Sequence, residues 1–130
     1  MSESFEQRKQ NLLMIRHKFL RFHKILLDWD RANYEKEPGV VSSGKFLERL
    51  LGDPRFQWLR TISTLIVRLD ESFELDDGMS KDMVEGFFEE IGNLFDDSEE
   101  YTEFKSRLSE ALPENESVVE LRQDIIDLLS

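Results

Sequence analysis

The segment PRFQWLRTISTLIVRLDESFEL, residues 54–75, has the pattern of a helix that is apolar around more than half of its circumference. Its apolar residues recur at steps of three and four, the spacing that places side chains on one face of an α-helix. A helix with so wide an apolar arc usually has neighbours on several sides. We therefore expect a helix from about Pro54 to Leu75 at the centre of the fold. The arc comprises Trp58, Leu59, Ile62, Leu65, Ile66, Leu69 and Phe73, extended by Phe56 and Val67.

A second long helix is predicted from about Glu3 to Lys36, where the dipeptide Pro38-Gly39 then stops helical structure. Its basic residues lie largely opposite its apolar face. We expect this helix and the helix at residues 54–75 to form the spine of the protein. The apolar face comprises Phe5, Leu12, Ile15, Phe19, Phe22, Ile25, Leu26 and Trp29.

Shorter amphipathic segments fill the rest of the chain, and period-2 alternation typical of strands is absent. Ser80 is positioned to cap the fourth helix, and Ser117-Val-Val-Glu120 has the form of a capping box that opens the sixth. Asp76-Asp77-Gly78 is expected to form a turn. The shorter helices are expected at about Gly44–Leu51, Lys81–Phe95 and Glu99–Leu112, and from Ser117 to the end of the chain.

This pattern predicts an all-α fold, a single-domain bundle of about six helices over residues 1–130. The last helix carries apolar residues up to its end, so it docks either on its own bundle or on a partner.

Part of the central segment also resembles a group of uncharacterised small helical bacterial proteins. The resemblance covers about residues 54–71 and rests on Trp58-Leu-Arg60, Ser63, Leu65-Ile-Val67 and Asp70-Glu71. It implies a bacterial origin, and it transfers neither an activity nor site residues.

The composition excludes several classes of protein. The chain has no cysteine, which rules out disulfides, thiolate metal sites and cysteine catalysis. No apolar run approaches the roughly 20 residues of a membrane span. The first residues, Met1 to Glu6, lack the basic and apolar regions of a secretory signal. We therefore expect a cytoplasmic protein that does not act at a membrane.

Charge is divided unevenly along the chain. Residues 1–68 carry 13 Lys and Arg against 8 Asp and Glu, whereas residues 69–130 carry 4 against 20. The two halves either attract each other within one fold or form a bipolar surface that guides self-association or binds a basic partner. The net charge of −11 repels phosphate at long range, so we expect no nucleic-acid partner.

Motifs for metals, nucleotides and known catalysts are missing. His17 and His23 are six residues apart on one helix and point in different directions, so they do not share an ion locally. The six glycines are scattered rather than gathered in a phosphate-binding loop. We expect no cofactor and no resident metal, and the pattern favours a protein that is not an enzyme.

Two groups of polar residues are candidates for a pocket between the two long helices. Arg16, His23 and Asp30 are spaced by seven residues beside the apolar face of the first helix, and Tyr34 continues the line. In such a pocket Asp30 would tune His23, and Arg16 would hold an anion. The alternative is that these are boundary residues satisfied by neighbouring helices or water.

The second group lies on the helix at residues 54–75. Ser63 and Asp70 border its apolar arc, and Arg60 lies on its polar side. A half-buried aspartate needs a partner because an uncompensated charge is costly away from water. Arg16, Arg60 or His23 is the expected partner of Asp70, and a structural network is favoured over catalysis.

The sequence therefore favours a non-catalytic helical interaction or adaptor protein that self-associates or binds another protein. The alternative is a small-ligand-binding protein or enzyme with its pocket between the two long helices.

Overall fold

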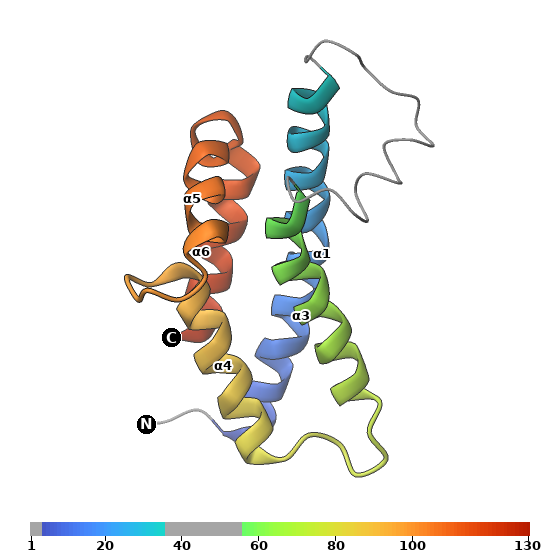
Figure 1. Cartoon of the computed structure of the whole chain (residues 1–130). Coiled ribbons are helices and arrows are strands. Elements are labelled where there is room, and N and C mark those ends of the chain that lie inside the picture. The colour runs from blue at the N-terminus through green and yellow to red at the C-terminus, as the bar shows by residue number, and fades with distance from the viewer. Residues whose placement is uncertain (1–3, 36–55) are drawn as a thin grey trace.

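The computed structural model describes residues 4–35 and 56–130 (Figure 1). Regular structure in these residues is helical throughout, which confirms the all-α class. The described residues form five α-helices, whereas about six were expected for the whole chain, and the predicted helix at Gly44–Leu51 lies outside these residues. The elements are α1 (Phe5–Glu35), α3 (Gln57–Phe73), α4 (Lys81–Phe95), α5 (Thr102–Ala111), the short 3₁₀-helix η2 (Leu112–Glu114) and α6 (Glu116–Leu129).

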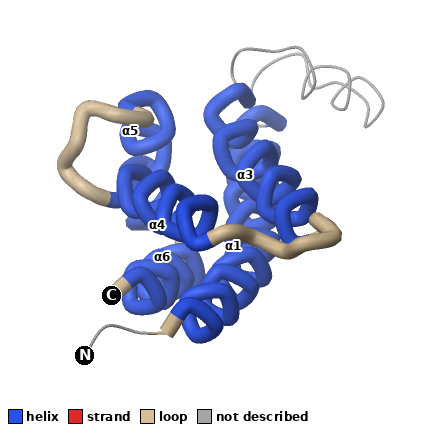
Figure 2. Tube along the Cα trace, turned by 90° about the horizontal axis from the view of Figure 1, so that it is seen from below, coloured by secondary structure: helices blue, strands red, loops and turns tan. Residues whose placement is uncertain are grey.

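The centre of the bundle is α1, against which α3, α4 and α6 all pack (Figure 2). At 31 residues it is about 46 Å long, so it reaches every neighbour. The expectation of a central α3 is wrong, since α3 flanks α1 and touches α5 on its other side. Val67, predicted to extend the apolar arc of α3, is instead 53% exposed. The buried face of α1 includes the predicted Leu12, Ile15, Phe19, Phe22 and Leu26.

A chain of aromatic rings connects the helices inside the core. Phe22 of α1 meets Phe95 of α4 with 6.2 Å between ring centroids, and Phe95 meets Phe104 of α5 at 6.5 Å. Trp58 of α3 lies 6.0 Å from Phe104. Rings at these distances contribute packing beyond their buried area. The chain therefore fixes α3 and α5 relative to the bundle.

The turn between α3 and α4 forms as predicted. Gly78 has a φ of 73°, a left-handed conformation that glycine adopts without a steric penalty. The Ser80 hydroxyl accepts the backbone N–H of Met83 at 3.2 Å and caps α4. The two helices are thus joined at one end by a short connection.

Two helix starts differ from the prediction. Residue Tyr101 is left-handed, with a φ of 57°, so α5 begins at Thr102 rather than Glu99. Helix α6 begins at Glu116, because the carbonyl of Asn115 accepts the first helical hydrogen bonds. The predicted capping box is wrong, since Ser117 already lies inside the helix.

The last helix docks on its own bundle. Val118, Leu121 and Ile125 of α6 are buried, and α6 packs against α1 and α4. No helix within the described segments has both the length and the apolar character needed to cross a bilayer.

Candidate functional site

The two predicted polar groups meet at one ion pair. Arg16 of α1 binds Asp70 of α3 through two guanidinium nitrogens: Nε donates to Oδ1, and Nη2 donates to Oδ2 at 3.3 Å. The side chains are 23% and 41% exposed. Of the three partners expected for Asp70, the structure selects Arg16. The pair ties α1 to α3 at the edge of their interface.

The second contact from the predicted column is buried. Asp30 is fully buried and accepts hydrogen bonds from Trp58 Nε1 at 3.0 Å and from Arg107 Nη2 at 2.8 Å. The Arg107 guanidinium lies 5.5 Å from the ring centroids of both Trp29 and Trp58. A buried carboxylate is tolerated only with partners of this kind. Asp30 therefore connects α1, α3 and α5.

The other candidates are dispersed. His23 is half-buried, and burial lowers the pKa of its imidazole, so the ring is neutral at pH 7. The Ser63 hydroxyl donates to the backbone carbonyl of Arg60 at 3.4 Å, and the Arg60 side chain is exposed. Tyr34 lies in α1, but its side chain is outside the described part of the structure.

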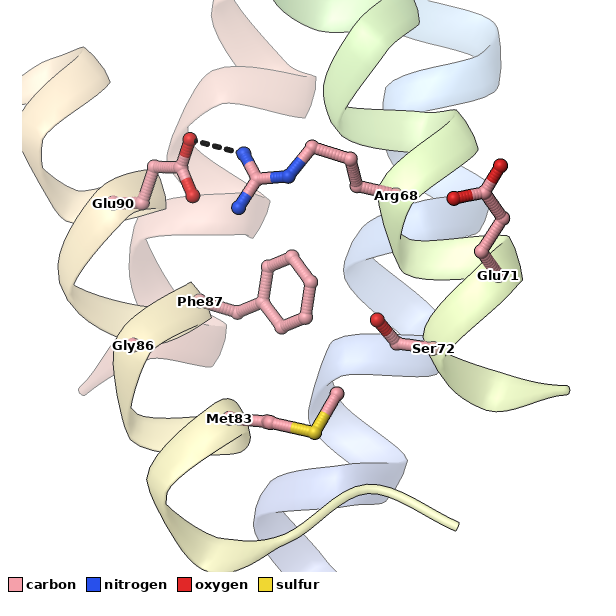
Figure 3. Close-up of a pocket in the computed structure, with 7 residues that line it drawn as sticks. All are labelled: Arg68, Glu71, Ser72, Met83, Gly86, Phe87 and Glu90. Atoms are coloured by element: carbon pink, nitrogen blue, oxygen red, sulfur yellow. Dashed lines mark hydrogen bonds and ion pairs between the residues drawn. The ribbon is translucent and has the colours of Figure 1, made fainter. Parts of the chain in front are cut away.

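A concave surface lies between α3 and α4. One hollow, about 490 Å³, is lined by Arg68, Glu71, Ser72, Met83, Gly86, Phe87 and Glu90 (Figure 3). A second, about 300 Å³, is lined by Gln57, Arg60, Thr61, Thr64, Leu65, Arg68, Glu90, Leu94 and Tyr101. Both include Arg68 and Glu90, so they are two ends of one surface, named here the α3/α4 groove.

The groove has an apolar floor. Phe87 and Met83 point from α4 toward α3 (Figure 3), and Leu65 and Leu94 line the other end. Phe87, Leu65 and Leu94 are at most 6% exposed and belong to the packed core. At Gly86 an added Cβ would meet nothing within 4 Å, which leaves the α4 wall open. The floor is thus held in place by core packing, and the space above it is open beside Gly86.

One polar bridge crosses the groove between its two ends. Arg68 Nη1 donates to Glu90 Oε1 at 2.5 Å, and the Tyr101 hydroxyl donates to the same oxygen at 3.3 Å. The hydrogen bond to Glu90 raises the pKa of Arg68. Burial, and secondarily the charge of Glu90, raises the pKa of Tyr101. Arg68 is therefore a cation and Tyr101 a hydrogen-bond donor at neutral pH.

Tyr101 occupies its place at a conformational cost. A left-handed backbone costs a non-glycine residue about 1–3 kcal/mol and requires support from its surroundings. The preceding turn supplies that support: Ser98 N–H donates to Asp96 Oδ1 at 2.9 Å, and Lys105 Nζ donates to the Ser98 carbonyl at 2.8 Å. Hydrogen bonds from Ser98, followed by Lys105, lower the pKa of Asp96, so the turn is held by an ionised carboxylate.

Exposed acidic residues lie beside the groove. Asp82 and Glu89 are four and three residues from Gly86 along α4, outside the lining of the two hollows. Glu71 on α3 lines the groove together with Glu90. Opposing them are Arg60 at one end and Arg68, which is already bound to Glu90. Among the lining residues these two bases balance the two acids, so the surplus negative charge near the groove comes from Asp82 and Glu89 beside it.

Neither histidine contributes to this surface, since both belong to α1. Within residues 4–35 and 56–130, no three His, Asp or Glu side chains are grouped so that they could hold a metal ion. The arrangement is a groove with apolar side chains at its base and polar residues along its sides.

Sequence reasoning missed the α3/α4 groove. A signal was present: Met83, Gly86, Phe87 and Glu90 recur at steps of three and four beside the core stripe of α4. That spacing places them on one face, but only the tertiary structure turns this face toward Arg68.

No protein-family model matches the chain, and neither a curated protein nor a solved structure is significantly similar to it.

Proposed function

We propose that this protein is a non-catalytic interaction module that binds an amphipathic helix of a partner in the α3/α4 groove. The observation that carries the proposal is a groove between two helices that pack on α1, with apolar side chains at its base and open space at Gly86. Amphipathic helices bind other proteins by placing their apolar face into such a groove.

The dimensions support a helical ligand. The α3 residues that line the groove run from Gln57 to Ser72, which is about 22 Å of helix, or some four turns. Phe87, Leu65 and Leu94 are fixed by core packing, so the floor needs no rearrangement before it binds. Apart from the Arg68–Glu90 bridge the groove is preformed, which reduces the entropy lost on binding.

The alternative of a small-ligand pocket between α1 and α3 is less well supported. Arg16 and Asp70 are bound to each other, and Asp30 is held by Trp58 and Arg107. A ligand at that position would have to break these contacts. A cytoplasmic location stays a prediction from the sequence.

Self-association is the other form that the interaction function could take. Leu13, Met14 and Leu20 on the outer side of α1 are 37–47% exposed, with the bases Arg21 and Lys24 close by in sequence. A concentration-dependent mass in sedimentation equilibrium would support self-association.

The test of the proposed function is selection of binders from a displayed library of helical peptides. Gly86→Trp places a bulky ring in the groove, and Gly92→Trp is the matched control on the same helix, where an added Cβ also meets nothing within 4 Å. Selected peptides should lose affinity for the Gly86 variant and keep it for the Gly92 variant. Equal affinity for both variants, or no selected peptide, would refute binding at this groove.

A further inference from the structure

We propose that the partner helix is basic, and that one of its Lys or Arg side chains takes the place of Arg68 on Glu90. This inference rests on the proposed function and adds to it the charge of the partner and the residue exchange that accompanies binding.

The acidic residues beside the groove complement a basic helix. Asp82 and Glu89 are exposed on α4 next to the lining residue Gly86, and Glu71 lines the groove from α3. A helix lying in the groove would bring its flanks against both walls. An acidic partner would meet like charges there, and a basic partner would meet opposite charges.

The Arg68–Glu90 bridge stands where a bound helix would lie. The Arg68 side chain reaches from α3 to Glu90 on α4 (Figure 3), and both residues line both hollows. Its guanidinium is 5.4 Å from the centroid of the Phe87 ring, over the floor. A helix that occupies the whole groove needs this space. Arg68 is 47% exposed, so its side chain can turn out into solvent.

The Glu90 carboxylate would lose its cation if Arg68 turned away. The Glu90 side chain is only 27% exposed, and without Arg68 it would keep the hydrogen bond from Tyr101. A partly buried carboxylate that loses its cation is destabilised unless another cation replaces it. A Lys or Arg of the partner, placed at the middle of its apolar face, supplies that replacement.

This geometry specifies the partner's sequence pattern. The central base binds Glu90, and apolar residues three or four positions away on either side reach the two ends of the floor. On one side they contact Met83 and Phe87, and on the other side Leu65 and Leu94. The partner is thus an amphipathic helix with one base inside its apolar stripe and further bases along its flanks.

The experiment compares two synthetic helices of about 18 residues, five helical turns, that share one Leu-rich face. One carries Lys at the central and flanking positions, and the other carries Glu. Their affinities for the full-length protein are measured by fluorescence anisotropy. A partly exposed ion pair changes an association constant by up to about fivefold, so two such pairs give the Lys helix a preference of up to about 25-fold.

Three variants test the exchange. Arg68→Gln should tighten binding of the Lys helix severalfold, because the internal competitor for Glu90 is gone. Glu90→Gln should weaken it. Glu85→Gln is the matched control, since it removes the same charge from an exposed position on α4 that does not line the groove. Weaker binding of the Lys helix to Arg68→Gln would overturn the exchange.

The outcomes separate the two proposals. If the Glu helix binds as tightly as the Lys helix and Gly86→Trp blocks both, the groove binds helices but the basic partner is wrong. If neither helix binds, the proposed function fails at this groove. Self-association that Gly86→Trp abolishes would show the occupant to be a second copy and overturn our choice of a separate partner.

Discussion

Replacing Asp30 with alanine should destabilise the protein by about 3 kcal/mol. Asp30 is fully buried and accepts hydrogen bonds from Trp58 and Arg107, so the truncation leaves both donors without this acceptor. Removing one partner of a buried ion pair typically costs about 3–5 kcal/mol, and leaving a buried donor unsatisfied costs about 1–3 kcal/mol. The lower end of the range of about 3–5 kcal/mol applies, because Arg107 is 29% exposed and keeps its bond to Glu110.

The assay is urea unfolding followed by far-UV circular dichroism. With a urea dependence of about 1.5 kcal/mol per molar for a domain of this size, the midpoint should fall by about 2 M. Asp30→Asn keeps a carbonyl acceptor and should lose roughly half as much stability.

Asp28→Ala is the control for this experiment. It removes a carboxylate two residues away that is 60% exposed and bound to Lys24, and it should change stability by less than about 0.5 kcal/mol. An Asp30→Ala variant within about 0.5 kcal/mol of the wild type would refute the view that Asp30 ties three helices together.

Four further outcomes follow from the structure. Leu65→Ala, at a core position 3% exposed, should cost about 2–5 kcal/mol in urea unfolding, whereas Val67→Ala at 53% exposure should cost less than about 0.5 kcal/mol. Gly86→Ala should raise stability by roughly 0.5–1 kcal/mol, since alanine is the better helix former and its Cβ meets no atom within 4 Å. Burial lowers the pKa of His23 below its ordinary 6.5. The contribution of the neutral ring to stability is therefore fully present above pH 6.5 and is lost as the pH falls through the folded-state pKa. His23→Gln should weaken this acid dependence in thermal melts. Melting temperature should rise from low to moderate NaCl, because salt screens carboxylate repulsion over about 10 Å at 0.1 M, and a falling melting temperature would show that attraction between the two halves dominates.

Local pattern was sufficient to predict most helices and their buried faces. The α4 helix runs from Lys81 to Phe95 as expected, with Ser80 as its cap. Helical periodicity depends only on residues three and four apart, so it is visible in a single sequence. The arrangement of the helices around one another is not visible in a single sequence. For this reason the sequence predicted α3 at the centre, which α1 in fact occupies.

Helix ends were less predictable because several short-range hydrogen bonds compete there. Ser117 and Glu120 match a capping box, yet the Asn115 carbonyl starts the helix two residues earlier. At the start of α5, the left-handed Tyr101 excludes Glu99 and Glu100 from the helix. Neither arrangement has a distinctive sequence pattern.

The polar contacts were likewise predictable only in part. The sequence predicts Arg16, Arg60 or His23 as the partner of Asp70, and the structure selects Arg16. The partner of Asp30, Arg107, is 77 residues away on a helix whose position no local pattern reveals. Several ion pairs, among them Lys18 with Asp124, join the basic first half to the acidic second half, as one reading of the charge split anticipated.

The α3/α4 groove depends on tertiary structure in the same way. Arg68 and Glu90 are 22 residues apart and become a bridge only when α3 and α4 flank α1.

The most direct test of helix binding in the groove is an NMR titration of the ¹⁵N-labelled protein with the Leu/Lys helix. Glycine amides are resolved in such spectra, so Gly86 in the groove and Gly92 outside it report separately. Binding as proposed shifts the amides of Gly86, Phe87 and Arg68 and leaves Gly92 and the outer α1 residue Leu20 in place. Shifts centred on Leu20, with Gly86 unmoved, would contradict binding in the α3/α4 groove.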